Sequence, residues 1–246
     1  MNRIIKKMMM PLRYFVQFLI TPYHVKAHNM MPPYKSHFVL LYEERLLQTS
    51  VDYAVKHFRQ SLYFHFTFEL WDYTMNRLRK SEAFNSTDLL LEFGTWQGTS
   101  INYFSSRIPE KTFFGFDSFE GLKEDWTGFS LPAGYFDLKG QLPKVNANVK
   151  LVKGWFDQSL PGFLEKNPAK ILFLHIDCDT YESTLYVLNT VKERLHKGTY
   201  ILFDEYIGYP NWEFGEYKAF QEFVSANNIQ YKYISFSVKQ VLIEIQ

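Results

Sequence analysis

The stretch that decides the fold runs from Leu89 to Gly98 and reads LLLEFGTWQG. Its apolar start predicts a buried strand, and Gly94 and Gly98 predict a sharp turn into a helix whose N-terminus faces a ligand. A dinucleotide-binding loop needs a third glycine in the pattern G-x-G-x-x-G. Glu92 would repel a pyrophosphate but suits a cationic group, such as the ammonium of a bound amino acid. An ordinary strand-to-helix turn with two glycines is the alternative.

The composition indicates a packed globular protein. The chain has 246 residues, of which 46% are hydrophobic, and a formal net charge of +1. This length fits one α/β domain with a small extension, and the balanced charge gives no indication of nucleic-acid binding. The single Cys178 excludes an internal disulfide framework and a multi-cysteine zinc site, and it favours a cytoplasmic location.

The N-terminal twenty residues are basic and then apolar, but the apolar run is too short to cross a bilayer. It is also a poor signal peptide, because Arg13 lies inside the apolar part. We therefore expect no transmembrane segment. A surface or partner-docking helix, with peripheral membrane contact left open, is the alternative to secretion. We also expect a homo-oligomer.

Short apolar runs alternate with helical patterns after residue 86. This order predicts a Rossmann-like α/β fold with a seven-stranded, mostly parallel sheet, helices on both faces and a C-terminal antiparallel hairpin. Residues 21–35 are expected to form an irregular arm and residues 39–80 two helices, so we divide the chain into an N-terminal arm and helical cap (1–80) and a second domain (81–246). The expected strands are 89–93, 112–116, 149–152, 171–176, 199–203, 231–237 and 240–245, and the expected helices in this domain are 101–106, 182–195 and 216–225.

Ligands of such sheets bind beyond the carboxyl ends of the strands, so the residues that follow each strand matter most. Asp117 ends the second strand, where a carboxylate can accept hydrogen bonds from both hydroxyls of a ribose. Its alternative role is that of a turn former or helix cap. Trp155 and Phe156 follow the third strand and could wall an adenine ring, with core packing as the alternative.

Four carboxylates follow the fourth and fifth strands, namely Asp177, Asp179, Asp204 and Glu205. They would meet at one edge of the sheet, where crowding is unfavourable unless a cation or shared protons neutralise them. Oxygen ligands favour Mg²⁺, Ca²⁺ or Mn²⁺ over zinc. His175 is either a further ligand or a hydrogen-bonded core residue, and Asp179 could also cap the next helix.

Cys178 lies between two of these acids. We expect a raised thiol pKa and therefore no thiolate nucleophile at this position.

These motifs, taken together and in order, resemble the macrocin O-methyltransferase family of class I S-adenosylmethionine-dependent methyltransferases, which modify sugars on macrolides and related glycosides. The resemblance covers about residue 87 to the C-terminus. It rests on Glu92–Gly98, Gly115–Leu122, Gly154–Phe156 with Leu160–Pro161, His175–Thr184 and Phe203–Tyr206.

The resemblance implies that S-adenosylmethionine binds with its amino-acid end near Glu92 and Gly94, its ribose on Asp117 and its adenine near Ser118 and Trp155. The remaining implied cofactor contacts are Gly98, Thr99, Ser100, Gly154 and Asp177.

The resemblance also implies a divalent metal, Mg²⁺, held by Asp177, Asp204 and Glu205. The sugar hydroxyl would bind this metal, and Asp177 or Asp179 would take its proton. Members of the family often carry two adjacent aspartates where this chain has Asp204 and Glu205.

The insertion Trp126–Asn148 is rich in glycine, proline and aromatic residues. It suits a lid over a sugar, with a packed surface loop as the alternative. The candidate lid residues are Trp126, Phe129, Tyr135 and Phe136, and Trp212, Glu216 and Tyr217 are further candidates for facing the acceptor. Two other functions stay open: an NAD-linked oxidoreductase on a related fold, and a non-catalytic S-adenosylmethionine-binding scaffold.

Overall fold

The computed structural model describes residues 33–126 and 131–246. The predicted N-terminal surface helix, most of the predicted arm and Phe129 lie outside these residues. The chain divides into two compact units, and the second, Leu46–Gln246, contains every strand found in the described residues. No helix in the described ranges is long and apolar enough to cross a membrane.

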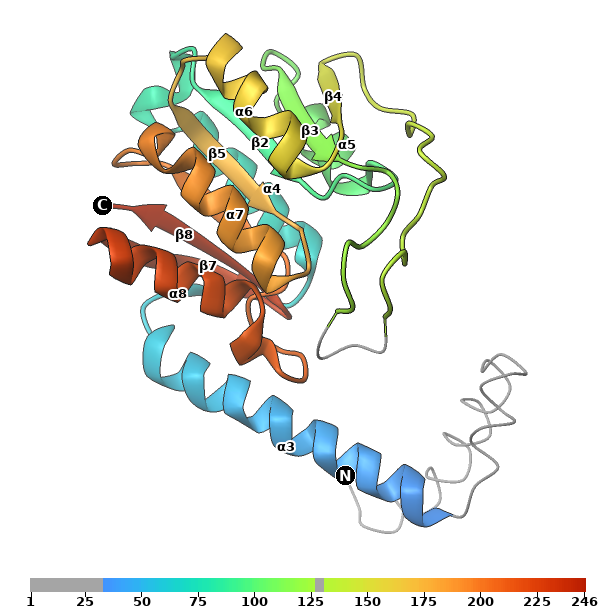
Figure 1. The fold of residues 1–246 in the computed structure, drawn as a ribbon. Coiled ribbons are helices and arrows are strands. Elements are labelled where there is room, and N and C mark those ends of the chain that lie inside the picture. Colours follow the sequence, from blue (N-terminus) through green and yellow to red (C-terminus); the bar gives the residue numbers. More distant parts are fainter. Residues whose placement is uncertain (1–32, 127–130) are drawn as a thin grey trace. The chain divides into compact units, whose positions relative to one another are not determined.

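One eight-stranded sheet forms the centre of the second unit, in the order β1-β7-β8-β6-β5-β2-β3-β4 (Figure 1). All neighbouring strands are parallel except that β8 runs antiparallel to both β6 and β7. The strands are β1 (Leu62–Phe64), β2 (Leu89–Phe93), β3 (Phe113–Asp117), β4 (Val149–Lys153), β5 (Ile171–Ile176), β6 (Tyr200–Phe203), β7 (Tyr231–Ser237) and β8 (Gln240–Ile245).

Helices cover both faces of this sheet. In Figure 1, α6, α7 and α8 lie in front of the strands and α4 and α5 behind them. The helices are α3 (Pro33–His57), α4 (Thr67–Arg79), α5 (Thr99–Arg107), α6 (Phe156–Lys166), α7 (Tyr181–Val191) and α8 (Glu216–Asn227), with short 3₁₀ turns at Glu82–Asn85, Lys192–Arg194 and Trp212–Phe214.

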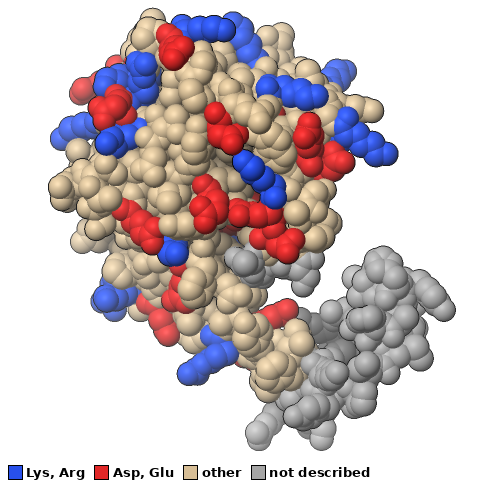
Figure 2. Space-filling view, viewed as in Figure 1, with Lys and Arg blue, Asp and Glu red and all other residues tan. Residues whose placement is uncertain are grey.

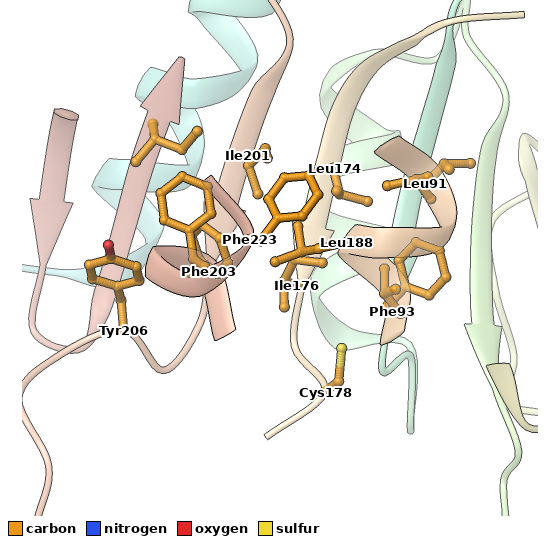
Figure 3. Packing of buried hydrophobic residues seen from close by; sticks show 14 of the residues in the cluster. Leu91, Phe93, Leu174, Ile176, Cys178, Leu188, Ile201, Phe203, Tyr206 and Phe223 are labelled. Atoms are coloured by element: carbon orange, nitrogen blue, oxygen red, sulfur yellow. The ribbon is translucent and has the colours of Figure 1, made fainter. Parts of the chain in front are cut away.

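The core is split by the sheet into two layers. Alternate residues of a strand point to opposite faces, so Leu91 and Phe93 pack under α6 and α7 whereas Leu90 packs under α4 and α5. Figure 3 shows the first layer, in which Ile176 and Phe203 continue the row across β5 and β6. Burial on both faces explains why the central strands are continuous apolar runs.

The structure confirms the predicted architecture of a mostly parallel sheet with a C-terminal antiparallel hairpin, and its last strand, β8, lies between β6 and β7. Four predicted strand ranges, those of β2, β5, β7 and β8, match residue for residue.

The prediction of seven strands was wrong by one edge strand. β1 pairs in parallel with β7, with Leu62 opposite Ser235. Residues 33–35, expected in the arm, are helical. Helix α6 was not predicted. The compact unit begins at Leu46, and the division of the chain at residue 80 stays a prediction.

Candidate active site

Two adjoining cavities open at the carboxyl ends of the strands. The larger has a volume of 820 Å³ and the smaller 320 Å³. The two cavities share five lining residues, which are Gly94, Trp96, Asp177, Asp204 and Lys239. Figure 2 shows acidic side chains gathered in the middle of the visible face, with basic side chains among them.

The Gly94 turn places β2 directly against the end of β5. Gly94 has φ +92°, and a Cβ there would overlap the carbonyl oxygen of Asp177 and lie 2.6 Å from its carbonyl carbon. The backbone N–H of Asp177 donates to Phe93 O (2.9 Å), and that of Asp204 donates to Ile176 O (2.9 Å). The ladder therefore continues one residue past each strand and sets both aspartates at the same edge.

Asp117 has the turn-forming role that the sequence left open, and its ribose-binding role stays a prediction. Its Oδ2 accepts the N–H of Trp96 (2.7 Å) and its Oδ1 that of Phe119 (2.6 Å), so it forms the turn after β3. It also lines the larger cavity together with Ser118 and Trp155. Burial raises the pKa of Asp117, and these backbone hydrogen bonds oppose that shift only in part.

Glu92 does not line either cavity. It is 1% exposed, and its Oε2 accepts a hydrogen bond from His175 Nδ1 (2.9 Å). The other ring nitrogen, Nε2, lies 3.7 Å from Asp204 Oδ1. Burial lowers the pKa of His175, but hydrogen bonds and charge from Asp204 and Glu92 outweigh it and raise the pKa to about 9. His175 is therefore a buried residue that hydrogen-bonds to Glu92, as its core alternative predicts, but it also belongs to a possible ligand group with Asp177 and Asp204, so the ligand role stays open.

The predicted carboxylates converge in two groups that share Asp177. Ligand atoms of His175, Asp177 and Asp204 lie within 4.8 Å of one another, and so do those of Asp177, Asp179 and Glu205. The predicted metal set of Asp177, Asp204 and Glu205 is therefore divided between the groups.

Burial and mutual repulsion set the ionisation of these acids. Burial, followed by the charges of neighbouring carboxylates, raises the pKa of Asp177 and Glu205 well above the ordinary range and that of Asp179 to about 8. Burial also raises the pKa of Asp204, but the imidazole of His175, 3.7 Å away, and the ammonium of Lys239 oppose this effect, and the pKa is lowered.

The donors present fit a hard divalent cation. Carboxylate oxygens dominate both groups, as Mg²⁺ prefers. Glu205 Oε2 is buried and has no hydrogen-bond partner among the described residues, so one ligand atom is available without breaking a contact.

Residues 91–206 match a family model described as a methyltransferase domain. The fold is that of a class I methyltransferase. The calicheamicin methyltransferase CalS11 has this fold with a TM-score of 0.57 at 20% identity, covering 87% of this chain and 93% of that one. The O-methyltransferase NovP gives a TM-score of 0.52 at 20% identity, covering 71% of this chain and 78% of that one.

A curated relative is the 8-demethyl-8-(2,3-dimethoxy-alpha-L-rhamnosyl)-tetracenomycin-C 4'-O-methyltransferase of Streptomyces olivaceus. It is 27% identical over 139 residues, which are 48% of this chain and 52% of the relative. The chain thus spans about half the length of this relative. The similarities agree with the predicted methyltransferase fold, and the narrower resemblance to the macrocin family stays a prediction.

Some of the other predicted cofactor residues line a cavity and others do not. Thr99 and Ser100, in the first turn of α5, line the smaller cavity. Gly98 is the N-cap of α5, with φ +79°. Neither Gly98 nor Gly154 lines a cavity. Of the candidate lid residues, Trp126 and Phe136 line the larger cavity, whereas Tyr135 does not.

Three candidate acceptor residues lie away from both cavities. Trp212 is buried and donates from Nε1 to Thr49 Oγ1 (2.8 Å). Glu216 is buried and its Oε2 accepts the N–H of Glu205 (3.1 Å), while Tyr217 packs edge-on against Tyr53. The three residues line neither cavity, because the 3₁₀ turn Trp212–Phe214 and the start of α8 pack into the core.

Cys178 lines the larger cavity, and burial together with neighbouring carboxylates raises its pKa, as predicted.

Two residues of the β7–β8 turn were missed. Lys239 Nζ lies 2.5 Å from Glu205 Oε1, and Gln240 Nε2 donates to Asp204 Oδ1. The sequence could have indicated both residues, because the very short turn between the last two strands must lie beside the end of the strand that β8 pairs with.

Proposed function

We propose that this protein is an S-adenosylmethionine-dependent O-methyltransferase that methylates a sugar hydroxyl of a glycoside or polysaccharide precursor, with assistance from Mg²⁺. One observation carries the proposal: a single cavity has Asp117 and Trp155 on its wall and also Asp177, Asp179, Asp204 and Glu205. This arrangement supports a site in which a nucleoside would bind beside a carboxylate cluster.

The cofactor would lie across both cavities. Asp117 can accept ribose hydroxyls, because each carboxylate oxygen has a second lone pair beyond the backbone bond it already makes. Trp155 would stack on the adenine, and Thr99 and Ser100 would hold the amino-acid end at the N-terminus of α5. S-adenosylmethionine supplies an electrophilic methyl group, so these residues need only bind and orient it.

Asp177 would hold the metal, with Asp204 and Glu205 as the further candidate ligands, one from each of the two groups that share Asp177. When bound, Mg²⁺ would neutralise part of the acidic cluster and lower the pKa of a sugar hydroxyl. His175 and Glu92 support this set from below, since the imidazolium orients the carboxylate of Asp204.

Asp179 is suited to take the hydroxyl proton, with Asp177 as the alternative base. It lines the larger cavity, and its pKa of about 8 lies close to neutral pH, where a general base is most effective. Its φ of +64° is unusual for a residue other than glycine and turns the chain sharply after β5.

A sugar acceptor is supported by the wall of the larger cavity and by relatives. Trp126 and Phe136 offer aromatic faces there, and the names of the Streptomyces olivaceus relative and of a CalS11 structure described as a TDP-rhamnose 3'-O-methyltransferase both specify a rhamnose. An NAD-linked oxidoreductase is not favoured, because the loop lacks the third glycine and the matching family model is a methyltransferase domain.

Binding and transfer test the proposal separately. S-adenosylhomocysteine should raise the Tm, and native mass spectrometry with S-adenosylmethionine, Mg²⁺ and a panel of glycosides should show a methylated product. Asp204→Ala should abolish transfer while it leaves S-adenosylhomocysteine binding largely intact. Asp72→Ala, which removes an exposed partner of Arg107, is the control. Absence of any S-adenosylhomocysteine binding would refute the proposal.

A further inference from the structure

Lys239 introduces a positive charge into the carboxylate cluster from the turn between β7 and β8. Its Nζ lies 2.5 Å from Glu205 Oε1, and the Glu205 side chain is 4% exposed. The residue lines both cavities, at the position where they adjoin. The Lys239 side chain itself is 33% exposed, so its ammonium reaches the buried Glu205 carboxylate from the solvent side of the site.

The backbone holds this turn in place over the end of β6. Lys239 O accepts the N–H groups of Tyr206 (2.9 Å) and Ile207 (3.2 Å). On the other side, a Cβ at Gly208 would lie 2.5 Å from Val238 O, so the two segments are in close contact. The ammonium cannot leave Glu205 by movement of the turn alone without breaking these contacts.

A divalent cation bound by Glu205 must contend with the same ammonium. Like charges so close together repel strongly at the low effective dielectric of a buried site. A metal that shared Glu205 with Lys239 would therefore bind less tightly than one that faced the free carboxylate. In the absence of a metal, the ammonium relieves the repulsion among Asp177, Asp179 and Glu205.

We propose that Lys239 is an internal counter-cation that competes with the divalent metal for Glu205 and so sets the metal affinity of the cluster. This inference rests on the metal site of the proposed function. Lys239 is a positioning residue in this account, because it acts through Glu205. Replacing Lys239 with a neutral residue strengthens metal binding and lowers the stability of the metal-free protein.

The experiment is a Mg²⁺ titration of the purified protein, by calorimetry and by Tm, without S-adenosylmethionine or acceptor. We expect Lys239→Met and Lys239→Gln to bind Mg²⁺ about tenfold more tightly than the unaltered protein, or more. Their Tm in excess chelator should fall and should recover on addition of Mg²⁺. Lys239→Arg keeps the charge and should keep the original affinity, as should Lys218→Met, which removes an ion-pair partner of Glu222 on α8.

The same substitution in a Glu205→Gln variant tests whether Lys239 acts on metal affinity through Glu205. In Glu205→Gln the carboxylate is gone, so a further Lys239→Met change should lose most of its gain in affinity. Equal or weaker Mg²⁺ binding by both neutral variants, or an undiminished gain in the Glu205→Gln background, overturns the proposal.

S-adenosylhomocysteine binding by the same proteins separates the two hypotheses. If it binds while Mg²⁺ binds to none of the variants, the counter-cation proposal and the metal site fail and the methyltransferase assignment stands. If it does not bind, the proposed function fails whatever the Mg²⁺ titration shows.

Discussion

Gly94→Ala tests how tightly the ends of β2 and β5 are packed. The new Cβ would lie 2.6 Å from the carbonyl carbon of Asp177, whereas ordinary contact begins at 3.4 Å. Because the carbonyl oxygen of Asp177 lies closer still, the end of β5 must move by more than 0.8 Å (3.4 minus 2.6) or the turn must rearrange. Overpacking of this kind costs about 1–3 kcal/mol.

The backbone conformation adds a second cost. Alanine at φ +92° is strained by about 1–3 kcal/mol. The two terms together predict a loss of about 4 kcal/mol. For a domain of this size that loss lowers the Tm by about 10 °C.

The matched control is Gly198→Ala. Gly198 has φ +90°, and nothing lies within 4 Å of a Cβ built there, so its variant pays only the conformational cost. Calorimetric Tm values should therefore fall about twice as far for Gly94→Ala as for Gly198→Ala. Equal losses in the two variants would refute the inferred contact between the Gly94 turn and Asp177.

Three further predictions concern other parts of the site and its support. Asp117→Asn should weaken S-adenosylhomocysteine binding by about 10–100-fold in calorimetry, since a hydrogen bond to a charged group contributes about 1.5–3 kcal/mol; unchanged affinity would exclude Asp117 as a ligand. Burial raises the pKa of Glu216 from 4.5 to about 8, so its bound proton stabilises the fold fully below pH 4.5 and this contribution is lost as the pH rises through 8. Glu216→Gln should therefore gain up to about 4 kcal/mol on the unaltered protein between pH 5 and 8, and a pH-independent Tm difference would contradict this. Tyr233→Phe removes hydrogen bonds to Tyr53 and Tyr206 and should cost about 1–3 kcal/mol with faster amide exchange in residues 46–57; unaltered exchange there would argue against this clamp on α3.

The central strands could be predicted from sequence because a change from apolar to polar or glycine residues marks where each of them ends. Both β2 and β5 are mainly apolar, and the residue that directly follows each strand is a glycine (Gly94) or an aspartate (Asp177). β1 could not, because its three residues are mostly exposed and become a strand only through pairing with β7, more than 160 residues away. Helix α6 contains Pro161 and Gly162, two residues that disfavour a helix interior in any local estimate.

The carboxylates of the candidate site follow from one rule of sheet topology. Asp177 and Asp204 had to meet because parallel strands end at the same edge. The sequence does not show which side of a helix or turn faces that edge. Glu216 was therefore expected at the acceptor and lies in the core, while Lys239 was not expected and lies in the cavity.

Because β8 lies between β6 and β7, the site is complete only when the final hairpin has joined the sheet. Lys239 and Gln240 reach Glu205 and Asp204 only after the final hairpin has entered the sheet, and β1 gains its partner at the same step. A chain that has collapsed around β2, β3 and β5 would still have an unfinished acidic cluster, so Mg²⁺ affinity should report the completion of the sheet during refolding.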